Sequence, residues 1–214
     1  MSEACKFWLN WGAQLAIATG TIGAVVVALF GNWIRNKLVP PKLEISMERP
    51  LGIEVPTILT SPNGDQREAK SRWYHMSVKN LRRWSPATQV QVFLTQVEKP
   101  DAAGEAKSIW VGEIPLKWRH QEIHPLARTI GYHAEIDLCS VVEGKWLEIH
   151  PLVAPAELQT RYKEQCVIFL SLQARSVESD SEVVRVKIAW DGQWSDDTEN
   201  MNLHMVVKID ETRN

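Results

Sequence analysis

One short segment carries residue types that could bind a metal ion, namely His120-Gln121-Glu122-Ile123-His124. In an extended strand alternate side chains share one face, so His120, Glu122 and His124 would point the same way. Imidazole and carboxylate groups are zinc ligands, and His133 could lie nearby. The spacing differs from the helical HExxH motif of metalloproteases, so it does not indicate catalysis. A polar loop between strands accounts for the same residues; we therefore predict no bound metal or other cofactor, and keep this set as the metal candidate.

Other catalytic patterns are missing from the sequence. It has no GxSxG nucleophile elbow, no glycine-rich phosphate loop and no paired carboxylates with an evident partner. Cys5, Cys139 and Cys166 are far apart and show no disulfide or CxxC spacing, which fits a reducing compartment. We expect Cys139 and Cys166 to be small buried side chains within strands. The sequence therefore predicts a protein that is not an enzyme.

One basic cluster could bind an anion. Lys79, Arg82 and Arg83 lie close together in the sequence and could contact a phosphate or an acidic partner. The whole chain has a formal net charge of -2, and Glu3 and Lys6 cancel, so the part from Arg35 onward keeps the full -2. This balance disfavours nucleic acid as a partner.

The strongest pattern lies near the N-terminus, where no charged residue occurs from Phe7 to Ile34. As a helix this stretch would be about 42 Å long, which exceeds the hydrocarbon thickness of a bilayer at roughly 30 Å. Trp8 and Trp11 at one end and Trp33 at the other are typical of membrane interfaces. A cleaved signal peptide would need small residues after the apolar stretch, whereas Phe30-Gly31-Asn32-Trp33 is bulky. We therefore predict a signal anchor, a transmembrane helix within residues 1–38.

Positive charge near the two ends of this segment predicts its orientation. Lys6 precedes the segment, whereas Arg35, Lys37 and Lys42 follow it. Because cytoplasmic flanks carry more Lys and Arg, we expect the N-terminus outside and the C-terminal domain on the cytoplasmic side of a cell inner membrane. Arg35 and Lys37, together with the three tryptophans, are the predicted interface anchors.

Small residues recur at every fourth position along the predicted helix: Gly12, Ala16, Gly20, Ala24 and Ala28. Such a stripe lets two helices approach closely in lipid, which favours a homo-oligomer or pairing with a partner helix. Glycine and alanine are also common in membrane helices in general, so both interpretations stay open.

The remainder, residues 39–214, alternates apolar and polar side chains with a period of two, which is typical of half-buried strands. Pro40-Pro41 ends the helix, and turn signals such as Pro62-Asn63-Gly64-Asp65 and Asp191-Gly192 separate the runs. The expected strands lie within residues 42–48, 74–79, 89–95, 108–114, 134–138, 146–150, 166–173, 184–190 and 203–209, with a short helix at 155–162. About eight antiparallel strands in a domain of this size predict an all-β fold, a β-sandwich with a barrel as the alternative.

A resemblance supports the sandwich. The stretch Tyr74-His75-Met76-Ser77-Val78-Lys79-Asn80, followed by Pro86-Ala87 and then Val90-Gln91-Val92-Phe93-Leu94, resembles the immunoglobulin-like sandwich of bacterial surface and membrane proteins. The layout, including Arg128-Thr129-Ile130-Gly131 before Asp137-Leu138-Cys139, is similar to uncharacterised bacterial single-pass membrane proteins with one N-terminal anchor and such a domain. The resemblance implies an immunoglobulin-like fold and brings no activity with it.

Seven of the ten tryptophans lie outside the predicted anchor, and three of them, Trp84, Trp118 and Trp194, have turn-like neighbours. These three either belong to the core or contact a partner or the bilayer surface. Together, the patterns predict a membrane-anchored, non-enzymatic module that presents its sandwich to a protein partner at the cytoplasmic face of the lipid bilayer. The alternative is a membrane effector or sensor, for example in bacterial defence or stress response, that oligomerises through its helix when the sandwich binds a ligand.

Overall fold

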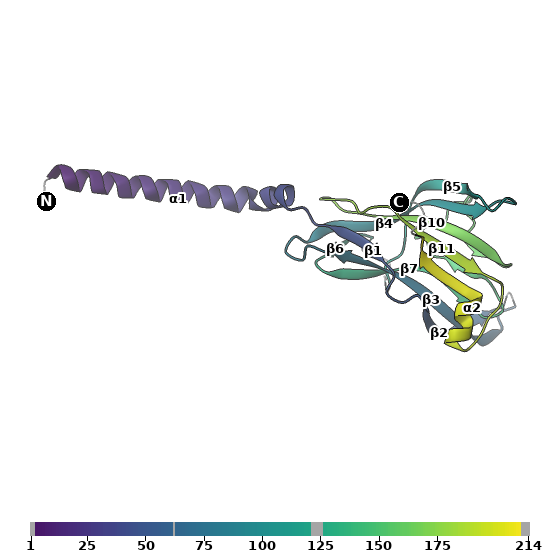
Figure 1. The fold of residues 1–214 in the computed structure, drawn as a ribbon. Coiled ribbons are helices and arrows are strands. Elements are labelled where there is room, and N and C mark those ends of the chain that lie inside the picture. Colours follow the sequence, from purple (N-terminus) through teal and green to yellow (C-terminus); the bar gives the residue numbers. More distant parts are fainter. Residues whose placement is uncertain (1–2, 62, 121–125, 211–214) are drawn as a thin grey trace. The chain divides into compact units, whose positions relative to one another are not determined.

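A computed structural model describes residues 3–61, 63–120 and 126–210, apart from the side chains of residues 3–10, 32 and 34–36. The chain divides into two compact units, Met1–Pro40 and Pro41–Asn214 (Figure 1). The first unit is helical, and the regular elements of the second are strands and one short helix.

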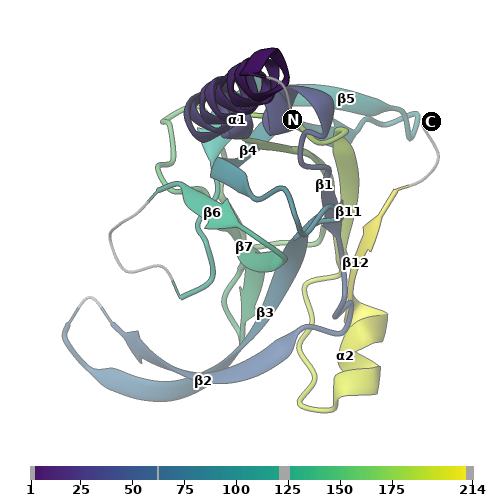
Figure 2. The ribbon, with the colours of Figure 1, turned by 90° about the vertical axis from the view of Figure 1, so that its left-hand side faces the viewer.

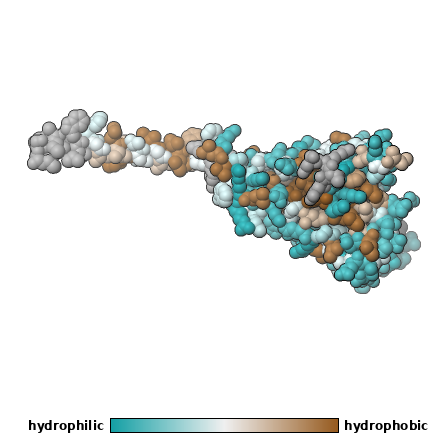
Figure 3. Space-filling model, in the orientation of Figure 1, coloured by the Kyte–Doolittle hydropathy of each residue, from teal (hydrophilic) through white to brown (hydrophobic). Residues whose placement is uncertain are grey.

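The first unit is the helix α1, which runs from Glu3 to Leu38. Within the described residues, one helical segment, Trp11–Gly31, is long and apolar enough to cross a membrane. Its large apolar side chains are exposed, as Figure 3 shows for the brown surface along the helix. Thr19 and Thr21 donate their hydroxyl hydrogens to the carbonyls of Leu15 and Ile17, at 2.8 and 2.9 Å, so the helix satisfies these polar groups itself.

The second unit contains two antiparallel sheets (Figures 1 and 2). In the first sheet the order is β1-β3-β7-β8-β9, and β2 also pairs with β3. Its strands are β1 (Leu43–Ser46), β2 (Ile53–Thr60), β3 (Gln66–Asn80), β7 (His133–Val142), β8 (Leu147–Ile149) and β9 (Arg161–Tyr162). Figure 2 shows β2 and the paired part of β3 extending as a curved arm.

In the second sheet the order is β12-β11-β10-β4-β5, and β6 pairs with β4. Its strands are β4 (Ala87–Pro100), β5 (Ala106–Pro115), β6 (Arg128–Ile130), β10 (Cys166–Arg175), β11 (Val184–Trp190) and β12 (Met205–Ile209). A short helix, α2 (Thr198–His204), leads into β12.

The inner faces of the two sheets share one hydrophobic core. Tyr74, Met76 and Val78 of β3 are buried there together with alternate residues of the other sheet, such as Leu170 and Leu172. Burying one such side chain stabilises the fold by about 1.5–3 kcal/mol. Cys139 and Cys166 are free and buried in β7 and β10, which confirms the prediction made for them.

The structure corrects the expected number and extent of the strands. The described residues form twelve strands rather than about eight: the nine expected ranges all contain a strand, and β2, β6 and β9 were not expected. β3 and β4 are also longer than their alternating cores. β6 and β9 have three and two residues, too few to show a period. β2 leaves most of its side chains exposed, and Pro56 interrupts its pattern.

The expected helix at 155–162 is wrong. Leu158 donates to the Pro155 carbonyl at 3.1 Å in a turn, and β9 follows. The second helix lies instead at 198–204, where Asp197 caps its start by accepting the Asn200 N–H at 2.8 Å. Residues 203–204 therefore end a helix rather than begin a strand. Aspartate is a strong N-cap residue, but seven residues are too few to show a clear helical period.

Gly52 is the glycine that the fold requires most. Its φ is +67°, and a Cβ added there would lie 3.0 Å from Arg72 Cγ, the Trp73 carbonyl oxygen and Tyr74 Cε1. Gly64 also has a positive φ, +88°, but nothing lies within 4 Å of an added Cβ. Substitutions at these two glycines therefore distinguish the cost of backbone strain, which both would have, from the cost of crowding, which only Gly52 would have.

Gly64→Ala is expected to lower the free energy of unfolding by about 1 kcal/mol, the cost of placing an L side chain at positive φ. Gly52→Ala should cost at least about 1 kcal/mol more, because buried neighbours must also shift. Urea denaturation of the full chain in detergent measures both values. Equal losses would show that Gly52 is not crowded.

Candidate functional site

The outer face of the second sheet carries a row of apolar side chains. Val167 of β10 pairs with Ala189 of β11, and Ala189 pairs with Val206 of β12, so the three residues lie side by side. Their neighbours along each strand, such as Ile168 and Ile188, point into the core and are fully buried. Because side chains alternate along a strand, Val167, Ala189 and Val206 must face outward.

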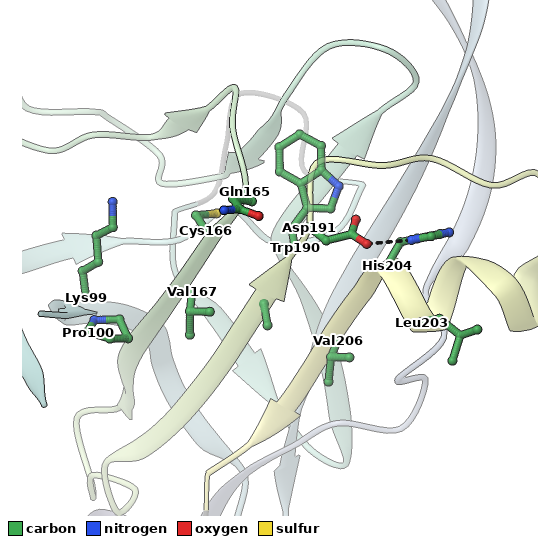
Figure 4. A pocket seen from close by; sticks show the side chains of 11 residues that line it. Lys99, Pro100, Gln165, Cys166, Val167, Trp190, Asp191, Leu203, His204 and Val206 are labelled. Carbon is green, nitrogen blue, oxygen red and sulfur yellow. Dashed lines mark hydrogen bonds and ion pairs between the residues drawn. The ribbon is translucent and has the colours of Figure 1, made fainter. Parts of the chain in front are cut away.

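This row forms the floor of a groove of about 450 Å³. Lys99 and Pro100, at the end of β4, line one side, while Leu203 and His204, at the end of α2, line the other (Figure 4). The Leu203 side chain is 76% exposed. The groove therefore offers an apolar floor with charged groups at its margins.

A hydrogen bond between side chains fixes the α2 end of the groove. His204 Nδ1 lies 2.8 Å from Asp191 Oδ2 (Figure 4), and the Asp191 N–H donates to the His204 carbonyl at 3.0 Å. Partial burial opposes ionisation of Asp191, but hydrogen bonds from His204 and the Gln193 N–H outweigh it and lower the pKa of the carboxyl. The groove thus keeps a negative charge at this margin.

The reactive side chain in the groove is shielded. Cys166 is only 7% exposed, and burial raises the pKa of its thiol to about 11. The thiolate is the nucleophilic form, so at neutral pH Cys166 is poorly suited to attack a substrate. The Trp190 indole N–H donates to the Gln193 carbonyl at 3.0 Å. The shielded thiol and the hydrogen-bonded indole favour non-covalent binding through shape and apolar surface over covalent chemistry.

A second candidate surface lies on the outer face of the first sheet. His75 of β3 and Asp137 of β7 are paired in register, with Nδ1 and Oδ1 3.0 Å apart. The Trp73 ring stacks on the His150 ring, with centroids 4.4 Å apart and planes 12° from parallel. A hollow of about 290 Å³ opens beside Trp73, His75 and Asp137. Sequence reasoning missed this cluster.

His150 and Ser140 form a hydrogen bond in this cluster, with His150 Nε2 and Ser140 Oγ 2.8 Å apart. Burial lowers the pKa of His150 to about 4, although the carboxylates of Glu148 and Asp137 oppose this shift. Ser140 is 2% exposed. A serine beside a histidine is the arrangement of many nucleophilic enzymes, but here the histidine is a weak base and the hydroxyl is buried. The pair is better explained as part of the packing under Trp73.

The metal candidate is only partly within the described residues. His120 has a φ of +55°, so it is not part of an extended strand, and it lines the hollow beside His75. Glu122 and His124 lie outside the described residues. Among the residues that the structure describes, no group of three His, Cys, Asp or Glu side chains could hold a metal ion.

The predicted basic cluster is spread around one turn. Lys79 Nζ lies 2.9 Å from Glu48 Oε1, and that hydrogen bond raises the pKa of Lys79. The Arg83 guanidinium carbon lies 3.8 Å from the centre of the Tyr132 ring. The backbone N–H of Arg82 donates to Asn80 Oδ1 at 3.0 Å.

The three tryptophans with turn-like neighbours differ from one another. Trp118 is 1% exposed and belongs to the core, and its indole N–H donates to the Leu126 carbonyl at 3.0 Å. Trp194 is half-buried against the core, and its indole N–H donates to Asp196 at 2.9 Å. Trp84 is 66% exposed. Of the three, only Trp84 has the exposure that a contact residue needs.

The residues predicted for the membrane lie in α1. Trp11, Trp33 and Lys37 are exposed, whereas the side chains of Trp8 and Arg35 are outside the described ones. In the small-residue stripe of Gly12, Ala16, Gly20, Ala24 and Ala28, a Cβ added at Gly12 or Gly20 would meet nothing within 4 Å beyond its chain neighbours and the adjacent helix backbone. Self-association through this stripe stays a prediction.

Comparison with known proteins gives no relative: no family model, no curated protein and no solved structure matches this chain. Function must therefore be argued from the surfaces themselves.

His150 gives a pH prediction. The folded chain keeps it neutral down to about pH 4, whereas in the unfolded chain it takes up a proton near its ordinary pKa of 6.5. The unfolded state then binds more protons in this window, so the stabilisation is complete above about pH 6.5 and falls as the pH is lowered to about 4. The loss is at most about 3 kcal/mol.

Urea denaturation at a series of pH values measures this slope. His150→Gln keeps an amide that can accept a hydrogen bond from Ser140 but does not titrate, so the slope between pH 6.5 and 4 should become much smaller. If the variant and the wild type have the same slope, other groups are responsible for it.

Proposed function

We propose that this chain is a membrane-anchored, non-enzymatic binding module that presents a β-sandwich to a protein partner at the cytoplasmic membrane face. One observation carries the proposal, the outward row of Val167, Ala189 and Val206 beside the exposed Leu203. An apolar row that the fold does not use for its own core is typical of a surface that binds a partner.

The shape of the groove favours a protein segment as the occupant. Three strands at about 4.8 Å spacing give a floor roughly 14 Å wide across the row, which suits two or three side chains of a partner. The groove borders β12, which lies at the edge of its sheet, so a partner chain could also reach the strand's open side. Lys99 and Asp191 at the margins could pair with opposite charges on the partner.

The strand order supports an immunoglobulin-like sandwich. In that fold one sheet has the order A-B-E-D and the other G-F-C, with C′ added beside C in some members. The orders β1-β3-β7 and β11-β10-β4-β5 follow the same scheme when the strands are taken in chain order. At the place of D this chain has β8, which follows β7 in sequence, and it adds β2 beside β3, β6 beside β4, β9 beyond β8 and β12 beyond β11.

The membrane part of the proposal rests on Trp11–Gly31, which is long and apolar enough to span, and on the cations that follow it. Lys37 and Lys42 follow this segment, which favours a helix in the inner membrane and a domain on its cytoplasmic side. The domain has its own core, so it should fold without the helix.

Deleting residues 1–40 is expected to move the protein from the membrane fraction to the soluble fraction while the remaining domain keeps a cooperative unfolding transition. Carbonate extraction of membranes and thermal denaturation measure the two properties. Loss of cooperative unfolding would contradict an independent domain, and a membrane fraction that survives deletion would contradict the anchor.

The groove is tested by placing a photo-crosslinking residue at position 203 of the full chain in cells. Position 183 is a matched control, because Val183 is also exposed, at 57%, but lies outside the groove. A discrete adduct is expected from position 203 and not from 183. Adding Ala189→Arg should reduce the amount of that adduct by about tenfold or more, since it places a long charged side chain on the apolar floor of the groove.

Equal adducts from positions 203 and 183 would indicate non-specific collision and contradict the proposed groove. An adduct unaffected by Ala189→Arg would place the contact elsewhere. Thermal denaturation of each variant checks that the domain remains folded.

A further inference from the structure

One end of the domain collects several loops around its first residues. Leu81 donates its backbone N–H to the Lys42 carbonyl at 2.9 Å, and Asn80 donates to the Tyr132 carbonyl at 2.8 Å. Ser179 Oγ donates to the Pro41 carbonyl at 2.7 Å. The β3–β4 turn, the β6–β7 turn and the β10–β11 loop thus meet where the domain begins. We call this set of loops the entry end.

Large apolar side chains project from the entry end. Leu81 is 45% exposed, Trp84 66%, Tyr132 53% and Val177 73%. They come from three separate loops, so their concentration here is a property of the fold rather than of one sequence run. Two of the four are the aromatic residues that favour the interface between lipid headgroups and hydrocarbon.

The turn that carries Trp84 is held in place from beneath. Asn80 is 1% exposed, and its side-chain N–H groups donate to the carbonyls of Ser85 and Ile130 at 2.8 and 3.3 Å. Its Oδ1 accepts the Arg82 N–H, and Ser85 donates its N–H to the Arg82 carbonyl at 2.9 Å. Residues 81–84 are therefore presented in a fixed shape, which lowers the entropic cost of binding.

Cations surround these aromatic side chains. Arg82 and Arg83 lie on the turn itself, Arg83 stacks on Tyr132, and Lys42 is exposed beside them. Of the nearby carboxylates, Glu48 pairs with Lys79, and Glu178 accepts hydrogen bonds from the Thr88 N–H and hydroxyl at 2.9 and 2.5 Å. Asp180 and Glu182 are exposed, but they lie on the β10–β11 loop rather than on the turn that carries Trp84. Glu44 is the exposed carboxylate of β1. Cations beside aromatic side chains suit an anionic lipid surface.

Chain connectivity brings this end within reach of the membrane. Only Val39 and Pro40 separate Leu38, the last residue of α1, from Pro41. At no more than about 3.6 Å per residue, this link spans roughly 11 Å at most. α1 continues for seven residues, about 10 Å, beyond Gly31, so if it is anchored as proposed above, the entry end stays within roughly 21 Å of the end of the apolar segment.

We propose that the entry end is a second membrane contact, which rests on the proposed anchor. Trp84 and Tyr132 insert into the headgroup region of an anionic bilayer, while Arg82, Arg83 and Lys42 bind lipid phosphates. Such a contact sets the orientation of the domain at the bilayer surface.

Hydrogen exchange of the full chain in vesicles tests this contact. Neutral phosphatidylcholine vesicles are compared with vesicles that also contain phosphatidylglycerol. Exchange of peptides covering 81–84 and 131–133 should be about fivefold slower or more in the anionic vesicles, and high salt should remove the difference. Arg82→Glu with Arg83→Glu should abolish it, and Trp84→Ser should reduce it.

The matched control is Arg67→Glu with Lys163→Glu, which makes the same charge change at exposed residues away from the entry end. This control should leave the protection unchanged. Equal melting temperatures of all variants show that they remain folded. Equal exchange in both vesicles, or equal loss in the control, would overturn the lipid contact. Protection that requires an added cytoplasmic extract would also overturn it, in favour of a protein.

The same samples also test the membrane anchor separately, by flotation of the chain with the vesicles. Failure of the chain to float with neutral vesicles would overturn the anchor. Flotation without protection of the entry end would overturn the second contact alone.

Discussion

The alternation of inward and outward side chains along β3, β4, β10 and β11 is the constraint on which the rest of this domain depends. Each sheet contributes one face to a shared core, and residues such as Met76, Ile168 and Ile188 are fully buried in it. A shift of one residue in any of these pairings would exchange the two faces. The outward row of Val167, Ala189 and Val206 exists because the core holds the alternate positions in register.

The parts that could be predicted from the sequence are those that show their pattern locally. The helix across Trp11–Gly31 and the strands with strict alternation followed from composition and period. β2 escaped prediction because it forms an arm whose two faces are both largely exposed. α2 escaped because its one clear signal, the Asp197 cap, precedes a stretch too short to show periodicity.

The candidate sites were harder to predict because each depends on pairing between distant strands. His75 meets Asp137 only through the register of β3 with β7, which shifts at a bulge between Tyr74 and His75. Trp73 meets His150 across that same sheet. In the basic cluster, sequence reasoning found Arg83 but not the Tyr132 ring beneath it, since the two residues lie on different turns. Such contacts can be predicted only when the register is known.

β4 connects the two surfaces discussed above. It begins at Ala87, next to the turn that carries Trp84, and ends at Pro100, which lines the groove. Its 14 residues span about 40 Å at the usual rise of an extended strand. A domain docked by its entry end would therefore hold a partner at a set height above the lipid. It would act as a molecular spacer, favouring partners whose binding segment stands well clear of the headgroups over those lying flat on them.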